Sequence, residues 1–262
     1  MGQVRQILLL LTLFSLSASA ASGLRDPAFL ASLSKTNAAA ASPSPSLVDA
    51  SLRYWWVASD KPLGLKVTNW LDRVQSQVLT NSNDGTRPTN SASGIAFNRL
   101  SSYSLQFSPT PTPASVNING TGVVYVIVTP TETASTFDSI ISTDDTAGAS
   151  LFTQDSGFTW GNNVAQTIFG PLTYGRTMDV MVVITNATAG GYGYTNGVFA
   201  KAFASNLGDL TGSLKSVGKD QNGAGHFYTG FIKEIIFYSN VLSTVSISNL
   251  HWYATNTYGF AP

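Results

Sequence analysis

Short apolar runs recur from Leu52 onward and are separated by clusters of Gly, Asn, Asp and Pro. Residues 123–128 (VVYVIV) form a continuous, mostly β-branched run, which is typical of a strand buried on both faces. Similar runs predict strands at residues 137–141 (FDSII) and 178–185 (MDVMVVIT). Many short strands with turns between them indicate an all-β sandwich or barrel.

Residues 231–238 (FIKEIIFY) predict a further strand, whose side chains should alternate between the two faces of the sheet. We expect one face to carry Phe231, Lys233, Ile235 and Phe237, and the other to carry Ile232, Glu234, Ile236 and Tyr238. The dipeptide Asn196-Gly197 lies between two further strand-like segments. It predicts a hairpin, because Asn and Gly both suit the positive φ angles of a type I′ turn.

A helix is predicted near the C-terminus. Ser243 is placed to cap it, and Ile247, Leu250 and Tyr253 or Ala254 follow at helical spacing. We expect this apolar stripe to pack on the edge of the sandwich.

The first twenty residues follow the layout of a secretory signal peptide. Arg5 precedes an apolar run at residues 7–16, and Ala18-Ser19-Ala20 supplies a cleavage site. The apolar run is too short to span a bilayer as a helix. We therefore predict that residues 1–20 direct secretion, to the extracellular space or to a cell or virion surface. No membrane span is expected after their removal.

Two further regions follow the predicted signal peptide. Residues 21–51 are rich in Ala, Ser and Pro, which indicates a linker or arm. Self-assembly through this arm is one partner hypothesis. Residues 52–262 carry the strand pattern and are assigned to a single β-sandwich domain.

The amino-acid composition argues against several classes of function. The 262 residues include 14 Lys and Arg against 14 Asp and Glu, and only 11% of residues are charged. Nucleic-acid binding is not expected, because it needs a basic face. The chain has no Cys and two His, which excludes disulfide scaffolds and Cys/His zinc sites.

Seven sequence blocks carry a family resemblance. They are residues 54–60 (YWWVASD), 67–73 (VTNWLDR), 81–88 (NSNDGTRP), 94–98 (GIAFN), 194–199 (YTNGVF), 230–243 (GFIKEIIFYSNVLS) and 250–259 (LHWYATNTYG). Together they resemble LamG-like domains of the concanavalin A-like lectin-glucanase superfamily. The resemblance implies a jelly-roll sandwich of two antiparallel sheets with a short C-terminal helix. It also implies structural roles for Asp72 and Glu234. The superfamily contains lectins, adhesion modules and glycoside hydrolases, so the fold alone leaves the function open.

The carboxylates that glycoside hydrolysis commonly requires have no counterpart in the sequence pattern. Most glycosidases place two carboxylates on either side of the scissile bond, and hydrolases of the resembled superfamily carry an E-x-D-x-E strand that is absent here. Glu132 and Glu234 are far apart in sequence, and Asp144 and Asp145 are adjacent, so on a strand they would point to opposite faces. The positions of these carboxylates therefore predict that the chain is not an enzyme.

The two histidines offer no nucleophile–base arrangement. The chain has no Cys and no G-x-S-x-G motif. His226 lies in a Gly-rich segment and His251 in the predicted helix. Both are interpreted as surface or packing residues.

Calcium is the one candidate cofactor, since many members of the resembled family bind it on a rim loop. Ca²⁺ needs six to eight oxygen ligands. The candidates are Asp60, Asp72, Asn83 and Asp84, with Asp144, Asp145 and Asp155 as a second set. The alternative is that these residues form turns and caps.

Aromatic residues are the candidate ligand contacts, because sugar rings stack on exposed aromatic faces. The candidates are Trp160, Tyr192, Tyr194 and Trp56, with ordinary packing as the alternative. Asn119 and Asn186 fit the N-glycosylation pattern, which matters only in a eukaryotic host.

These features of the sequence favour a secreted, non-catalytic β-sandwich module that binds a glycan or another extracellular surface. The alternative is a structural component of an extracellular or virion assembly, such as a filament, surface layer or decoration protein. Low charge and the Ala/Pro-rich arm suggest this alternative. A glycoside hydrolase is the third and least favoured hypothesis.

Overall fold

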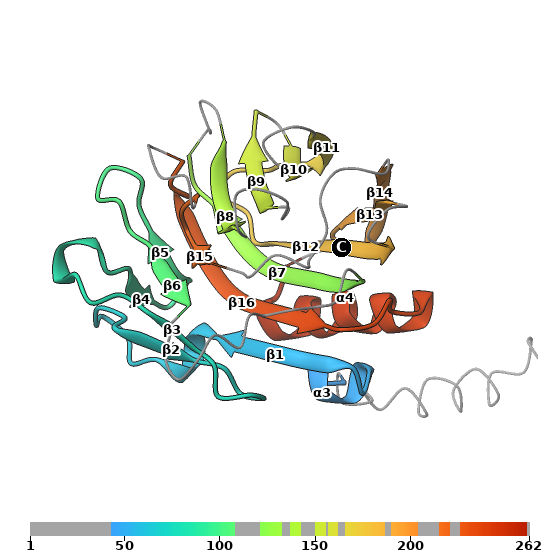
Figure 1. Ribbon diagram of the computed structural model, residues 1–262, viewed down its shortest axis with the longest axis horizontal. Coiled ribbons are helices and arrows are strands. Elements are labelled where there is room, and N and C mark those ends of the chain that lie inside the picture. Colours follow the sequence, from blue (N-terminus) through green and yellow to red (C-terminus); the bar gives the residue numbers. More distant parts are fainter. Residues whose placement is uncertain are drawn as a thin grey trace, which may run out of the picture. The chain divides into compact units, whose positions relative to one another are not determined.

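Two antiparallel β-sheets face each other across an apolar core in the computed structural model of the protein (Figure 1). The described residues are 43–107, 121–132, 137–142, 150–155, 157–161, 166–186, 190–203, 215–220 and 226–260. Within them each sheet has eight strands. The predicted signal peptide, most of the predicted arm, Asn119, Asp144 and Asp145 lie outside the described residues.

The strand order defines the two sheets. Sheet A runs β14 (Val198–Phe203), β13 (Gly190–Thr195), β12 (Met178–Asn186), β7 (Gly122–Pro130), β16 (Gly230–Tyr238), β5 (Gly94–Phe97) and β4 (Thr89–Ser91), and β1 (Leu52–Val57) also pairs with β16. Sheet B runs β11 (Gln166–Pro171), β10 (Gly157–Gly161), β9 (Ser150–Gln154), β8 (Asp138–Ser142), β15 (Ser216–Val217), β6 (Leu105–Phe107), β3 (Val78–Thr80) and β2 (Asn69–Leu71). The predicted two-sheet antiparallel sandwich is confirmed.

The central strand β7 explains why its sequence is apolar without alternation. Val124, Val126 and Val128 point into the core between the sheets. Val123, Tyr125 and Ile127 point to the opposite face of sheet A, where they belong to a second apolar cluster. Both faces are covered, so every residue of β7 is buried, as the sequence predicts.

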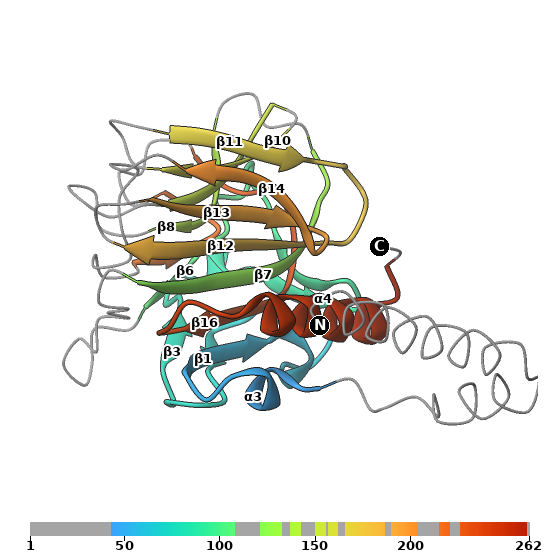
Figure 2. The ribbon, with the colours of Figure 1, turned by 90° about the vertical axis from the view of Figure 1, so that its right-hand side faces the viewer.

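Helix α4 (Thr244–Tyr258) covers the outer face of sheet A (Figure 2). The Ser243 side chain accepts a hydrogen bond from Ser246 N, which confirms the predicted cap. Ile247 and Leu250 are buried against apolar residues of β7, β12 and β16. The expectation that the helix would pack on the sandwich edge is therefore wrong, because three central strands present apolar side chains to it.

Strand β16 breaks the predicted alternation. Its pairing with β7 shifts register between Ile232 and Glu234, as expected for a β-bulge. Ile232 therefore joins Ile235 and Phe237 in the core between the sheets. Glu234, which was expected on the same face as Ile232, instead accepts hydrogen bonds from Tyr253 and Tyr258 of α4.

The Asn196-Gly197 hairpin forms between β13 and β14 as predicted. Both residues have positive φ, of 50° and 70°. Asp179 of β12 accepts from Gly197 N at 3.1 Å and contacts the His251 Nδ1 atom of α4. His251 thus links the helix to the hairpin, which is a packing role.

The packed part of the chain begins before residue 52. Helix α3 (Pro45–Val48) lies in the segment assigned to the arm, and the Tyr238 hydroxyl donates to Pro45 O at 2.8 Å. Val48 packs against the cluster beneath α4. Across the described ranges, no helix combines the length and hydropathy needed to cross a bilayer.

Candidate functional site

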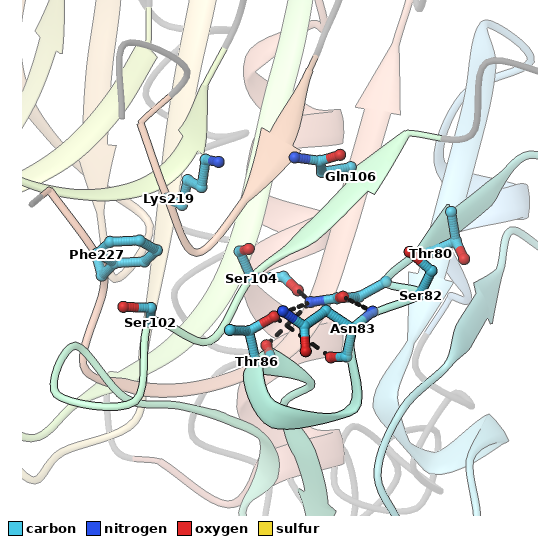
Figure 3. Close-up of a pocket in the computed structure, with 10 residues that line it drawn as sticks. Thr80, Ser82, Asn83, Thr86, Ser102, Ser104, Gln106, Lys219 and Phe227 are labelled. Carbon is cyan, nitrogen blue, oxygen red and sulfur yellow. Dashed lines mark hydrogen bonds between the residues drawn. The ribbon is translucent and has the colours of Figure 1, made fainter. Parts of the chain in front are cut away.

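A groove of about 430 Å³ opens at the end of sheet B, where β3 and β6 meet the 3₁₀ helix η2 (Asp84–Thr86) (Figure 3). Its described lining is almost entirely uncharged and polar, with one aromatic ring and one ammonium group. The residues are Thr80, Asn81, Ser82, Asn83, Thr86, Ser102, Ser104, Gln106, Lys219 and Phe227. They come from segments that are distant in sequence and meet through sheet pairing.

The wall of the groove at residues 81–87 is held by its own hydrogen bonds. The Asn81 amide donates to Thr86 O at 3.0 Å and to Ser104 O at 2.8 Å. Its Oδ1 accepts from Asn83 N at 2.8 Å, and Asn83 Oδ1 accepts from Gly85 N. A wall that is formed before binding reduces the entropy lost when a ligand is held.

Two side chains on the opposite side carry polar groups without partners. Neither the Gln106 amide nor the Lys219 ammonium makes a hydrogen bond or ion pair within the described part of the chain. Figure 3 shows these two groups turned toward each other. Phe227 is half-buried and adds an apolar surface. The groove therefore offers donors, acceptors and one ring, which suits a polyhydroxylated ligand.

The four first-choice calcium candidates each have a structural partner. Asp60 forms a bidentate ion pair with Arg73, in which Oδ1 accepts from Nη2 at 2.6 Å and Oδ2 accepts from Nε at 2.8 Å. Asp72 is buried and accepts from the backbone N–H groups of Trp55, Val74 and Gln75. This geometry is that of a turn cap.

The other two candidates lie on the wall of the groove. Asp84 pairs with Lys66 at 2.8 Å and with Arg87 at 2.9 Å. The hydrogen bond from Lys66 lowers the pKa of Asp84. Asn83 caps η2. The described residues contain no group of three or more His, Cys, Asp or Glu side chains that could hold a metal ion. Calcium binding stays a prediction.

The second calcium set is only partly described. Asp155 lies after β9 with φ of 50°, and its backbone oxygen accepts from the Tyr174 hydroxyl. Asp144 and Asp145 lie outside the described residues.

Two of the aromatic candidates are buried in the core, and the other two are an exposed and a partly buried tyrosine on one strand. Trp56 is 0% exposed, stacks on Tyr54 and donates to Trp70 O. Trp160 is 2% exposed and belongs to the core between the sheets. Neither ring has a face on the surface, so both are corrected to core residues. The small polar neighbours of Trp160 in sequence concealed its position inside a strand.

Tyr192 and Tyr194 do lie together on the outer face of β13. Tyr192 is 40% exposed, and Phe199 of the neighbouring strand β14 is 54% exposed. The centroid of the Phe199 ring lies 6.1 Å from that of Tyr192 and 5.8 Å from that of Tyr194. Phe199 was not among the sequence candidates, although the hairpin register that pairs it with Tyr194 follows from the Asn-Gly turn. This aromatic cluster lies on strands at the opposite edge of sheet A from β4 and β5.

Glu234 holds the helix to sheet A. Its side chain is 0% exposed and accepts from Trp55 Nε1 at 2.8 Å, from the Tyr253 hydroxyl at 2.6 Å and from the Tyr258 hydroxyl. Burial raises its pKa, and the three donors act in the opposite direction. The geometry fits the structural role that the family resemblance implies.

A carboxyl pair that the sequence analysis missed lies at the end of β7 and the start of β8. The Arg99 guanidinium lies 3.6 Å from both Glu132 and Asp138. Asp138 is buried, and burial raises its pKa. Nearby, His226 Nδ1 lies 3.3 Å from Asp220. No local motif marks this cluster, because Arg99 comes from a different segment.

Comparisons with solved structures find the same fold in larger proteins, whereas no family model and no curated protein matches. Trypanosoma rangeli sialidase in complex with sialic acid matches with a TM-score of 0.61 and 12% identity, over 79% of this chain and 33% of the sialidase. The binding domain of Paraclostridial Mosquitocidal Protein 1 matches with a TM-score of 0.55 and 12% identity, over 76% of this chain and 51% of that one. The chain thus spans about a third of the sialidase, and the likeness shows the fold alone.

The prediction that the chain is not an enzyme is contradicted by these matches, since sialidases are enzymes. The prediction relied on a missing pair of carboxylates, but sialidases with a tyrosine nucleophile do not follow the two-carboxylate scheme. A missing E-x-D-x-E strand therefore cannot exclude glycosidase chemistry. At 12% identity, the matches do not establish an activity for this chain either.

Proposed function

We propose that this chain is a secreted, LamG-like β-sandwich of the concanavalin A-like superfamily that binds a glycan in the groove between β3, β6 and η2. The observation that carries the proposal is the contrast within the groove. The wall at residues 81–87 is paired internally, whereas Gln106 and Lys219 present polar groups without partners in the described residues. Secretion is proposed from the N-terminal signal pattern.

A glycan fits the chemistry of this lining. Sugar hydroxyls both donate and accept, and the groove supplies amide and hydroxyl groups that do the same. Sugars also carry apolar C–H faces, which the half-buried Phe227 ring can cover. The shared fold with a sialidase that was solved with sialic acid supports a sugar ligand as a proposal.

The test is a glycan array followed by calorimetric titration of the best binder. We expect the intact chain to bind at least one glycan, and Gln106→Ala to weaken that binding about fivefold, because one hydrogen bond contributes about 1 kcal/mol. Gln166→Ala is the matched control, since Gln166 is also an exposed glutamine on a strand of sheet B. Parallel titrations with calcium and with EDTA test the calcium prediction.

Two results would overturn the proposal. One is the absence of binding across a diverse array, with calcium present as well as absent. The other is a bound glycan whose affinity is the same for the intact chain, Gln106→Ala and Gln166→Ala.

A second candidate function is a component of an extracellular or virion assembly. It is favoured by edge strand β14, where Val198 and Phe199 are 66% and 54% exposed. Exposed apolar edge strands tend to pair with other chains. Light-scattering mass measurements on the intact chain, on Phe199→Ser and on a chain lacking residues 21–42 test it. Monomers in all three cases would contradict assembly through either segment.

A further inference from the structure

The charge of the groove points to a particular class of glycan. Lys219 is the one charged side chain among the ten described lining residues. Its backbone is fixed, because its carbonyl oxygen accepts from Ser216 Oγ at 2.8 Å and the residue forms an antiparallel bridge with Phe227. The side chain extends from this fixed point into the groove (Figure 3). The ammonium group is thus placed by the fold without being neutralised by it.

The carboxylates around the groove are already engaged by other groups. Asp84 on the wall pairs with both Lys66 and Arg87. Asp220, the residue after Lys219, lies 3.3 Å from His226 and accepts from Ser142.

The carboxyl pair near the groove has its own cation. Glu132 and Asp138 share Arg99, which lies three residues before the lining residue Ser102. The remaining unpaired charge that faces the groove from the described residues is therefore the positive charge of Lys219. An ammonium group in this position attracts an anion more than a neutral sugar.

We propose that the groove selects anionic glycans, in which a carboxylate or sulfate group on a sugar ring accepts hydrogen bonds from Lys219. In this arrangement Gln106 and the hydroxyl groups of the wall bind the neutral part of the same sugar. The inference rests on the proposed function, and it names the ligand class of the same groove. The lysine ammonium group acts as a point charge with hydrogen-bond donors, so it can bind either a carboxylate or a sulfate, since both are anions that accept hydrogen bonds.

Matched ligand pairs separate charge from sugar identity. The probes are trigalacturonate against its methyl ester, and a sulfated galactan oligosaccharide against its desulfated form, each titrated calorimetrically into the intact chain. We expect the anionic member of at least one pair to bind ten times more tightly or better at 50 mM salt. This advantage should shrink at 500 mM salt, because the ionic contact is screened. The pair that shows the advantage identifies the anionic group.

Variants locate the effect at Lys219. Lys219→Gln should remove the difference in affinity between the anionic and the neutral member of the pair, whereas Lys219→Arg should retain most of that difference. Lys201→Gln is the control, because Lys201 is an exposed lysine on β14, outside the groove. Thermal unfolding of each variant checks that the fold is intact.

The outcomes distinguish this inference from the proposed function. If neutral and anionic members bind equally and binding still depends on Gln106, the groove binds glycans and the anionic preference is wrong. If the preference persists in Lys219→Gln, the inference is also wrong. If no glycan on the array or in the pairs binds at all, the proposed function fails and the inference fails with it.

Discussion

Two polar regions of this sandwich use similar residues in opposite ways. Beneath α4, Glu234 is enclosed by three donors and has no exposed surface. In the groove, Gln106 and Lys219 face solvent and have no partner within the described residues. A buried polar group that is fully paired holds elements together, whereas a polar group left open on a fixed frame is available to a ligand. The first region should therefore govern stability and the second should govern binding.

The largest effect is expected from Glu234→Ala. The substitution leaves Trp55 Nε1 and two tyrosine hydroxyls without their acceptor, and each such loss costs roughly 1–3 kcal/mol. Urea unfolding at pH 7 should show a loss of about 4 kcal/mol, or a chain that does not fold. Glu132→Ala is the control and should change the free energy of unfolding by less than about 0.5 kcal/mol, because the Glu132 side chain is half exposed. If the Glu234 variant were as stable as the control, the claim that the region beneath α4 governs stability would be wrong.

Leu250→Ala tests whether α4 belongs to the stabilising region. Leu250 is fully buried against sheet A, so the substitution should reduce the free energy of unfolding by about 3 kcal/mol. Val245→Ala on the same helix should have little effect, because Val245 is 70% exposed. Urea unfolding measures both. If α4 were only loosely attached, the two variants would behave alike.

Asn81→Ala tests whether the wall of the groove contributes to glycan binding. Asn81 holds residues 81–87 through bonds to Thr86, Ser104 and Asn83. Loosening this wall should weaken glycan affinity about tenfold, since binding must then order it. Titration with the array glycan measures the change, with Asn256→Ala on α4 as an exposed control outside the groove. Equal affinity in both variants would mean that the wall is not part of the site.

The smallest effect is a pH dependence of stability. Burial raises the folded-state pKa of Glu234 and of Asp138 above their unfolded values. The folded state then holds these protons more tightly, so their contribution is most favourable below the unfolded pKa and declines as pH rises through the raised values. Glu234→Gln should flatten this decline in urea midpoints measured between pH 3.5 and 8. Parallel curves for the intact chain and the variant would contradict the sign that we assign.

Local signals in the sequence were enough to predict much of the fold. The apolar run at 123–128, the Asn196-Gly197 turn and the Ser243 cap each depend on a few consecutive residues, and the structure contains all three. The errors concern longer-range geometry. The bulge in β16 moves Ile232 to the other face, and the position of α4 depends on three strands from distant segments.

The groove was much harder to predict than the fold. Its lining combines residues 80–86, 102–106, 219 and 227, which the strand order of sheet B brings together. Among the sequence candidates, only Asn83 lines the groove and Asp84 lies on its wall, and both were predicted as calcium ligands. Aromatic residues were chosen by their polar neighbours in sequence, which do not report burial, so Trp56 and Trp160 proved to be core residues.

The central claim is that the open groove binds a glycan, and calorimetric titration of the strongest array glycan into the intact chain and Gln106→Ala tests it most directly. We predict saturable binding to the intact chain, about fivefold weaker binding to Gln106→Ala and unchanged binding to Gln166→Ala. Identical affinities for all three proteins, or no binding to any glycan, would contradict the claim.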